Sequence, residues 1–121
     1  MSAREEKLKS ILLELERNSE VTNSAIVNLQ GQMMAHAMHN DANEQGVSAM
    51  TAALTSVASR VSDVLESGNT GSILIDGDEK NIMVKILTNA ALIALTPSDA
   101  KVGLVEFELD NAQKEIKSVL G

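Results

Sequence analysis

The chain has 121 residues, of which 44% are hydrophobic, and a formal net charge of -7, values typical of one globular domain that can bury a core. The acidic balance disfavours nucleic acids and anionic lipid surfaces as partners, and a single aromatic residue excludes base-stacking platforms. The absence of cysteine excludes disulfides and thiol catalysis. With a charged start and no apolar run of the ~20 residues that span a bilayer, we expect one cytoplasmic domain over residues 1–121 without membrane insertion.

The first predicted element is an amphipathic helix from about Ala3 to Arg17, because apolar residues recur there at helical spacing. Two short strands follow, at Val21–Leu29 and Gln32–Met38. The intervening Gly31 favours a tight turn, so the pair is predicted to be a hairpin. The polar stretch His39–Gly46 then indicates a surface loop.

A long helix is predicted over Gly46–Ser67, and its two faces differ. One face carries an apolar stripe that we expect to be core against a sheet: Val47, Met50, Leu54, Val57, Val61 and Val64. The opposite face carries small side chains, followed by two charged ones: Ala49, Ala52, Ala53, Ser56, Arg60 and Asp63. Small side chains allow two helix backbones to approach closely. This face therefore indicates either an exposed alanine-rich helix or a surface for self-association.

Three further strands are predicted at Ser72–Asp76, Asn81–Leu87 and Ala90–Leu95. Their connections are too short for crossover helices, which predicts an antiparallel meander. Several of these strands are apolar without alternation, so the sheet needs cover on both faces. Thr96–Asp99 combines a cap residue, a proline and an acid, which predicts the start of a last helix that ends near Leu120.

Chemistry-bearing motifs are sparse. Neither the phosphate-binding loop nor the dinucleotide-binding fingerprint occurs, so no cofactor is expected. The metal-type residues that lie close together are His36, His39, Asp41 and Glu44. We interpret them as a polar loop rather than a metal site, because nothing in their spacing fixes a ligand geometry. We predict that the chain is not an enzyme.

Three segments resemble the roadblock / dynein light chain family in their order and separation: Leu8–Leu15 leading into Val21–Gly31, Ser48–Leu54, and Leu92–Val105. The resemblance implies an α+β, profilin- and longin-like fold in which a five-stranded antiparallel sheet carries helices on both faces. It also implies a homodimer in which the long helices meet and the third strands pair. The role that it implies is regulatory, as a platform or activator for Ras-like small GTPases or as a scaffold.

We therefore expect a non-enzymatic homodimer that binds and regulates a Ras-like small GTPase. A structural adaptor in a motor, cytoskeletal or membrane-associated assembly is the alternative, and a sensor or enzyme that uses residues 36–44 is a third hypothesis. The expected dimer interface comprises Ala49, Ala52, Ala53, Ser56, Arg60, Asp63, Ser72, Ile73, Leu74 and Ile75. The expected contacts to the GTPase are Arg60, Asp63 and Glu66.

Overall fold

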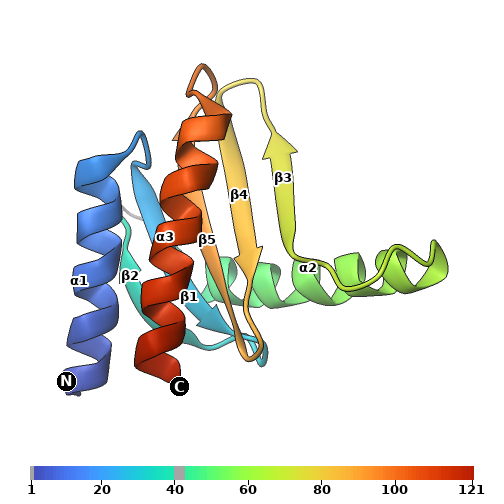
Figure 1. Cartoon of the computed structure of the whole chain (residues 1–121), viewed down its shortest axis with the longest axis horizontal. Helices are drawn as coiled ribbons and strands as arrows, with labels where there is room; N and C mark the ends of the chain where they lie inside the picture. The colour runs from blue at the N-terminus through green and yellow to red at the C-terminus, as the bar shows by residue number, and fades with distance from the viewer. Residues whose placement is uncertain (1, 40–42) are drawn as a thin grey trace.

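The computed structural model describes residues 2–39 and 43–121. Its three helices are α1 (Ala3–Asn18), α2 (Glu44–Val64) and α3 (Val102–Leu120). Its five strands are β1 (Asn23–Asn28), β2 (Met33–Ala37), β3 (Ser72–Asp76), β4 (Lys80–Ile86) and β5 (Ala90–Pro97). The expected element order and the α+β architecture are both confirmed (Figure 1).

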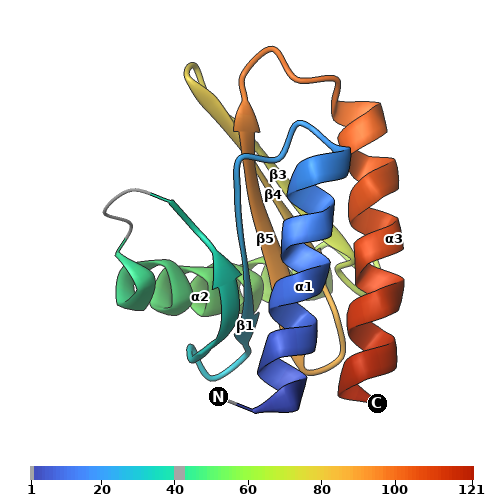
Figure 2. The same cartoon turned by 90° about the vertical axis from the view of Figure 1, so that its left-hand side faces the viewer.

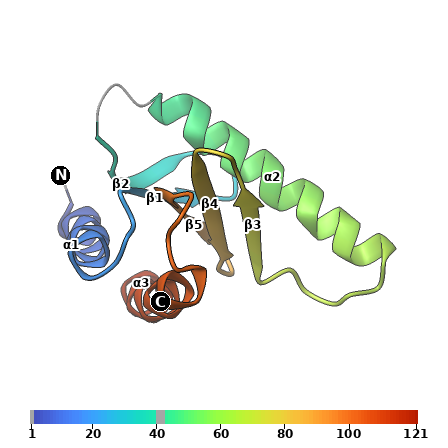
Figure 3. The ribbon, with the colours of Figure 1, turned by 90° about the horizontal axis from the view of Figure 1, so that it is seen from above.

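The strands form one antiparallel sheet in the order β2-β1-β5-β4-β3, so β2 and β3 are its edges. The predicted hairpin (β1 and β2) and the predicted meander (β3 to β5) are therefore confirmed. Antiparallel α1 and α3 lie side by side on one face of the sheet, and α2 lies on the other (Figure 2). Seen from above, α2 crosses the sheet obliquely, and its second half extends past the edge strand β3 (Figure 3).

The hairpin turn between β1 and β2 is fixed by one asparagine and one glycine. Asn28 Oδ1 accepts hydrogen bonds from the backbone N–H groups of Gln30 (3.1 Å) and Gln32 (2.9 Å). Gly31 adopts a φ of 86°, in the region that other residues rarely enter. A Cβ at Gly31 would lie 3.8 Å from Ala49 Cα, so the turn also rests against α2.

The main hydrophobic core lies between the sheet and the α1/α3 layer. Ser2 caps the N-terminus of α1, because its hydroxyl accepts a hydrogen bond from the Glu5 N–H at 3.0 Å. The inward stripe of α1 meets apolar residues of α3 and of the central strands. The fully buried members of this core include Leu8, Leu12, Ile26, Leu92, Leu109 and Ile116.

The prediction that the apolar stripe of α2 packs against the sheet is wrong. The buried residues of α2 are Ser48, Thr51 and Thr55. Each hydroxyl donates to a backbone carbonyl one turn earlier, for example Thr51 to Val47 O at 2.7 Å, so its burial leaves no hydrogen bond unmade. Short side chains also let α2 lie close to the sheet. Val47 and Leu54 of the apolar stripe are only half-buried, and its other four residues are exposed.

The predicted start of the last helix at Thr96–Asp99 is also wrong. Strand β5 continues to Pro97, which lies opposite Lys80 at the end of the ladder, where proline is tolerated. Helix α3 begins instead at Val102. Its N-terminus is capped from a distance, because the Glu20 carboxylate accepts a hydrogen bond from the Lys101 N–H at 2.8 Å.

Candidate interaction surface

The large hydrophobic side chains that α2 exposes belong to its apolar stripe. Met50, Val57, Val61 and Val64 are 67%, 57%, 51% and 79% exposed. Val57, Val61 and Val64 lie in the half of the helix that extends past β3 (Figure 3). One protomer therefore presents an apolar helix face that nothing in the described chain covers.

The edge strand β3 continues this apolar surface onto the sheet. Ile75 lies opposite Ile82 of β4, which lies opposite Leu95 of β5, so these three side chains share the face on which α2 lies. Leu74 points to the other face and is 51% exposed. Among the described residues, strand β3 pairs with β4 alone, so its outer backbone edge is open to another strand.

A groove of about 740 Å³ separates α2 from the uncovered part of this sheet face. Met50 and Leu54 form its helical wall, and Ile82 and Ile93 belong to its floor. Lys80 is the lysine that lines this groove. The groove is thus mainly apolar, and it joins the exposed stripe of α2 to β3.

The small-residue face predicted for self-association lies beside this surface. Ala49, Ala53 and Ser56 are exposed, and Ala52 is half-buried near the β1–β2 turn. Ala53 and Val57 are one helical turn apart, so the two faces adjoin along α2. The spacing of the stripe fits a buried helix face as well as an exposed one, so the sequence analysis did not predict that the stripe is exposed. The signal that could have shown it is the set of hydroxyl residues on the opposite side of α2, Ser48, Thr51 and Thr55.

The charged residues expected to contact a partner, Arg60, Asp63 and Glu66, are exposed on or just after the second half of α2. None of the three forms an ion pair within the part of the chain that the structure describes. Glu66 has a φ of 53°, at the point where the chain leaves the helix. The structure thus groups these residues near the exposed apolar stripe.

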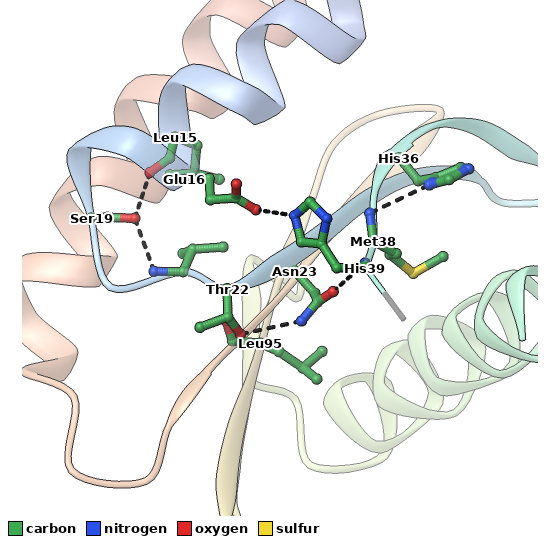
Figure 4. A network of polar contacts seen from close by, with 10 residues as sticks. Leu15, Glu16, Ser19, Thr22, Asn23, His36, Met38, His39 and Leu95 are labelled. Carbon is green, nitrogen blue, oxygen red and sulfur yellow. Dashed lines mark hydrogen bonds and ion pairs between the residues drawn. The ribbon is translucent and has the colours of Figure 1, made fainter. Parts of the chain in front are cut away.

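The two histidines bind carboxylates of two different helices. His39 Nε2 lies 2.6 Å from Glu16 Oε1 of α1, and the His39 N–H donates to Asn23 Oδ1 at 2.7 Å (Figure 4). His36 Nε2 lies 3.1 Å from Glu44 Oε1, at the start of α2. Asp41 lies outside the described residues. Among the described residues no group of three histidine or carboxylate side chains could hold a metal ion. The two histidine–carboxylate pairs instead connect the end of β2 to α1 and to the start of α2.

One ionised group is buried beneath α3. Lys85 of β4 binds Glu106 and, at 3.0 Å, Asp110. Burial, the largest effect, lowers the pKa of Lys85, but hydrogen bonds to the two carboxylates and their charges together raise that pKa above its ordinary value. The ammonium is therefore retained in the fold, where it joins α3 to the sheet.

An antiparallel sheet between two helical layers defines a three-layer α+β domain. The chain belongs to the Roadblock/LC7 domain family, whose model matches residues 7–96. It is 24% identical over 115 residues to the uncharacterized protein MJ0714 of Methanocaldococcus jannaschii, with 95% of this chain and 98% of that protein covered.

Solved structures share the whole fold at low identity. Myxococcus xanthus MglB aligns with a TM-score of 0.92 at 13% identity, covering 99% of this chain and 92% of that one. A Roadblock/LC7 domain from Streptomyces avermitilis aligns with a TM-score of 0.86 at 13% identity, covering 93% and 96%. Acanthamoeba castellanii profilin IA aligns at 0.65 and 13% identity, covering 96% and 98%. The expected family and the profilin-like fold are thereby confirmed. None of the helices in the described ranges combines the length and apolar character of a membrane crossing.

Proposed function

We propose that residues 1–121 act as one roadblock domain that pairs with a second copy of itself through α2 and β3. The observation that carries this proposal is the continuous apolar surface formed by the α2 stripe, the groove and β3. Exposed apolar surface costs free energy in water, and a contiguous patch favours a protein partner. A second copy suits it, because each chain offers both a groove and an overhanging apolar helix.

In the proposed dimer, β3 of each protomer pairs with β3 of its partner and the two sheets become one. Pairing satisfies the open backbone groups of both edges. The second half of α2 then lies over the partner's groove. Ser72, Ile73, Leu74 and Ile75 supply the strand part of the interface, as expected from the sequence. We assign its helical centre to Met50, Val57 and Val61, with the predicted residues Ala49, Ala52, Ala53, Ser56, Arg60 and Asp63 along its border.

We further propose that this dimer is a non-enzymatic, cytoplasmic regulator or scaffold that binds a Ras-like small GTPase. Membership of the Roadblock/LC7 family supports this role, and the fold similarity to MglB agrees with that membership. The GTPase contacts that we propose are Arg60, Asp63 and Glu66, which are exposed in the described structure without ion-pair partners there. Polar groups around an apolar centre are typical of protein interfaces.

The test uses the Ras-like GTPase encoded nearest to the gene of this chain. We expect the purified protein to bind it in one nucleotide state and to change its rate of GTP hydrolysis or nucleotide exchange. Arg60→Glu should abolish binding, whereas the matched change Arg4→Glu on α1 should not. Binding without any change of rate would favour the alternative function, a structural adaptor. No binding in either nucleotide state would contradict the proposal for this GTPase.

A further inference from the structure

A second concavity of about 820 Å³ lies on the side of α2 away from the apolar stripe. It is bounded by the second half of α2, the segment 69–71, the last residue of β4 and the turn that follows β4. Its lining comprises Leu29, Ala52, Thr55, Ser56, Ser59, Arg60, Asn69, Thr70, Gly71, Ile86, Leu87 and Thr88. None of these residues lines the apolar groove, so the two concavities are separate.

The charge of this pocket is opposite to that of the molecule. Arg60 is its one ionised lining residue, and no carboxylate lines it, although the chain carries a net charge of -7. Asp63 follows Arg60 by three residues on α2, yet Arg60 forms no ion pair with any residue that the structure describes. A guanidinium has five N–H donors and remains charged at every physiological pH. The N–H donors of Arg60 are therefore available to form an ion pair with a ligand in the pocket.

Further polar side chains line the same pocket as Arg60. The hydroxyls of Ser56, Ser59 and Thr88 and the amide of Asn69 make no side-chain hydrogen bond within the described chain. Hydroxyls and amide N–H groups can donate to the same acceptor as the guanidinium. The pocket thus combines one cation with several hydrogen-bond donors, which is the chemistry that an oxyanion requires.

The wall opposite α2 is held in place before any ligand arrives. The Thr70 hydroxyl lies 2.5 Å from Ser62 Oγ and donates to Ala58 O at 3.3 Å. The Ile86 N–H donates to Gly71 O at 2.9 Å, which ties the same segment to β4. Open space remains above Gly71, where a Cβ would meet nothing within 4 Å. Preorganisation lowers the entropic cost of binding.

We propose that this pocket binds a small organic oxyanion, a phosphate or carboxylate group on a partly apolar molecule. Arg60 supplies the positive charge, and Ser56, Ser59, Asn69 and Thr88 supply further donors. The apolar lining residues Leu29, Ile86 and Leu87 contact the remainder of the ligand. All lining residues of the pocket belong to one protomer. Ala52, Ser56 and Arg60 also border the proposed dimer interface, and Arg60 is a proposed GTPase contact, so a bound GTPase and the ligand would compete for Arg60.

The test is nuclear magnetic resonance titration of the ¹⁵N-labelled full chain with three probes: inorganic phosphate, glycerol 3-phosphate and butyrate. We expect saturable shifts of the Ser59, Arg60, Thr70 and Gly71 amides with at least one probe. Arg60→Gln should weaken that binding by roughly tenfold or more, since it removes a charge-assisted hydrogen bond. Arg60→Lys should retain part of the affinity. Arg4→Gln, which removes the same charge from α1, should leave it unchanged.

The three probes distinguish the possible ligands. Tighter binding of glycerol 3-phosphate than of phosphate supports a phosphate monoester whose carrier contacts the apolar lining residues, and preference for butyrate supports a carboxylate. Arg60 is exposed, so its variants should fold, and their amide spectra check this directly. Shifts that grow without saturation, spread over the surface or persist in Arg60→Gln with all three probes would overturn the proposal.

Discussion

Lys85 is the residue whose burial most needs explanation, because a buried ammonium is unstable without partners. Its two carboxylates, Glu106 and Asp110, remain partly exposed to water, which screens the attraction. We predict that Lys85→Met, which keeps the apolar stem but removes the charge, lowers the free energy of unfolding by about 1–2 kcal/mol. Urea unfolding measures this loss. The matched control is Lys114→Met, an exposed lysine of α3, and equal losses in both variants would contradict the role assigned to Lys85.

The pH dependence of this difference follows from the raised pKa of Lys85. A base whose pKa is higher in the folded state stabilises that state fully at pH values below its unfolded-state pKa, ordinarily 10.5. The stabilisation is lost as the pH rises through the folded-state pKa. The difference in unfolding free energy between wild type and Lys85→Met should therefore be constant from neutral pH up to about the ordinary lysine pKa and shrink above it.

At the scale of elements, α3 depends on a residue far from it in sequence. Glu20, after α1, caps the Lys101 N–H, and the N-cap residue itself forms no side-chain hydrogen bond. We predict that Glu20→Ala lowers the unfolding free energy by about 0.5–1 kcal/mol, through loss of an acceptor and of a favourable charge at the helix N-terminus. Urea unfolding of Glu20→Gln separates the two effects, and Glu79→Ala in an exposed turn is the control. A loss no larger than that of Glu79→Ala would argue against the cap.

The elements that depend on local sequence were predictable, and those that depend on distant partners were not. The Asn28–Gly31 hairpin and the leucine stripe of α1 carry their own turn and periodicity signals. The Thr96–Asp99 pattern predicts a helix start, but β5 continues to Pro97 and α3 begins at Val102. There the N–H of Lys101 binds Glu20, which is distant in the sequence. In α2, the spacing of apolar and small residues predicts two different helix faces, but it does not tell which of the two packs against the sheet. Buried hydroxyls that bond to their own helix backbone resemble a polar surface face in a sequence.

At the scale of the whole molecule, we predict that the protein is a dimer in solution. Light scattering should give about twice the chain mass of 12.9 kDa. Val61→Glu should shift the protein to a monomer, because the interface would bury a carboxylate without a partner at a cost of several kcal/mol. Leu104→Glu makes the same change at a similarly exposed position on α3, on the opposite side of the sheet, and should leave the dimer intact. A monomeric wild type would contradict the proposal. A dimer that survives Val61→Glu but not Ala53→Glu would place the contact on the small-residue face instead.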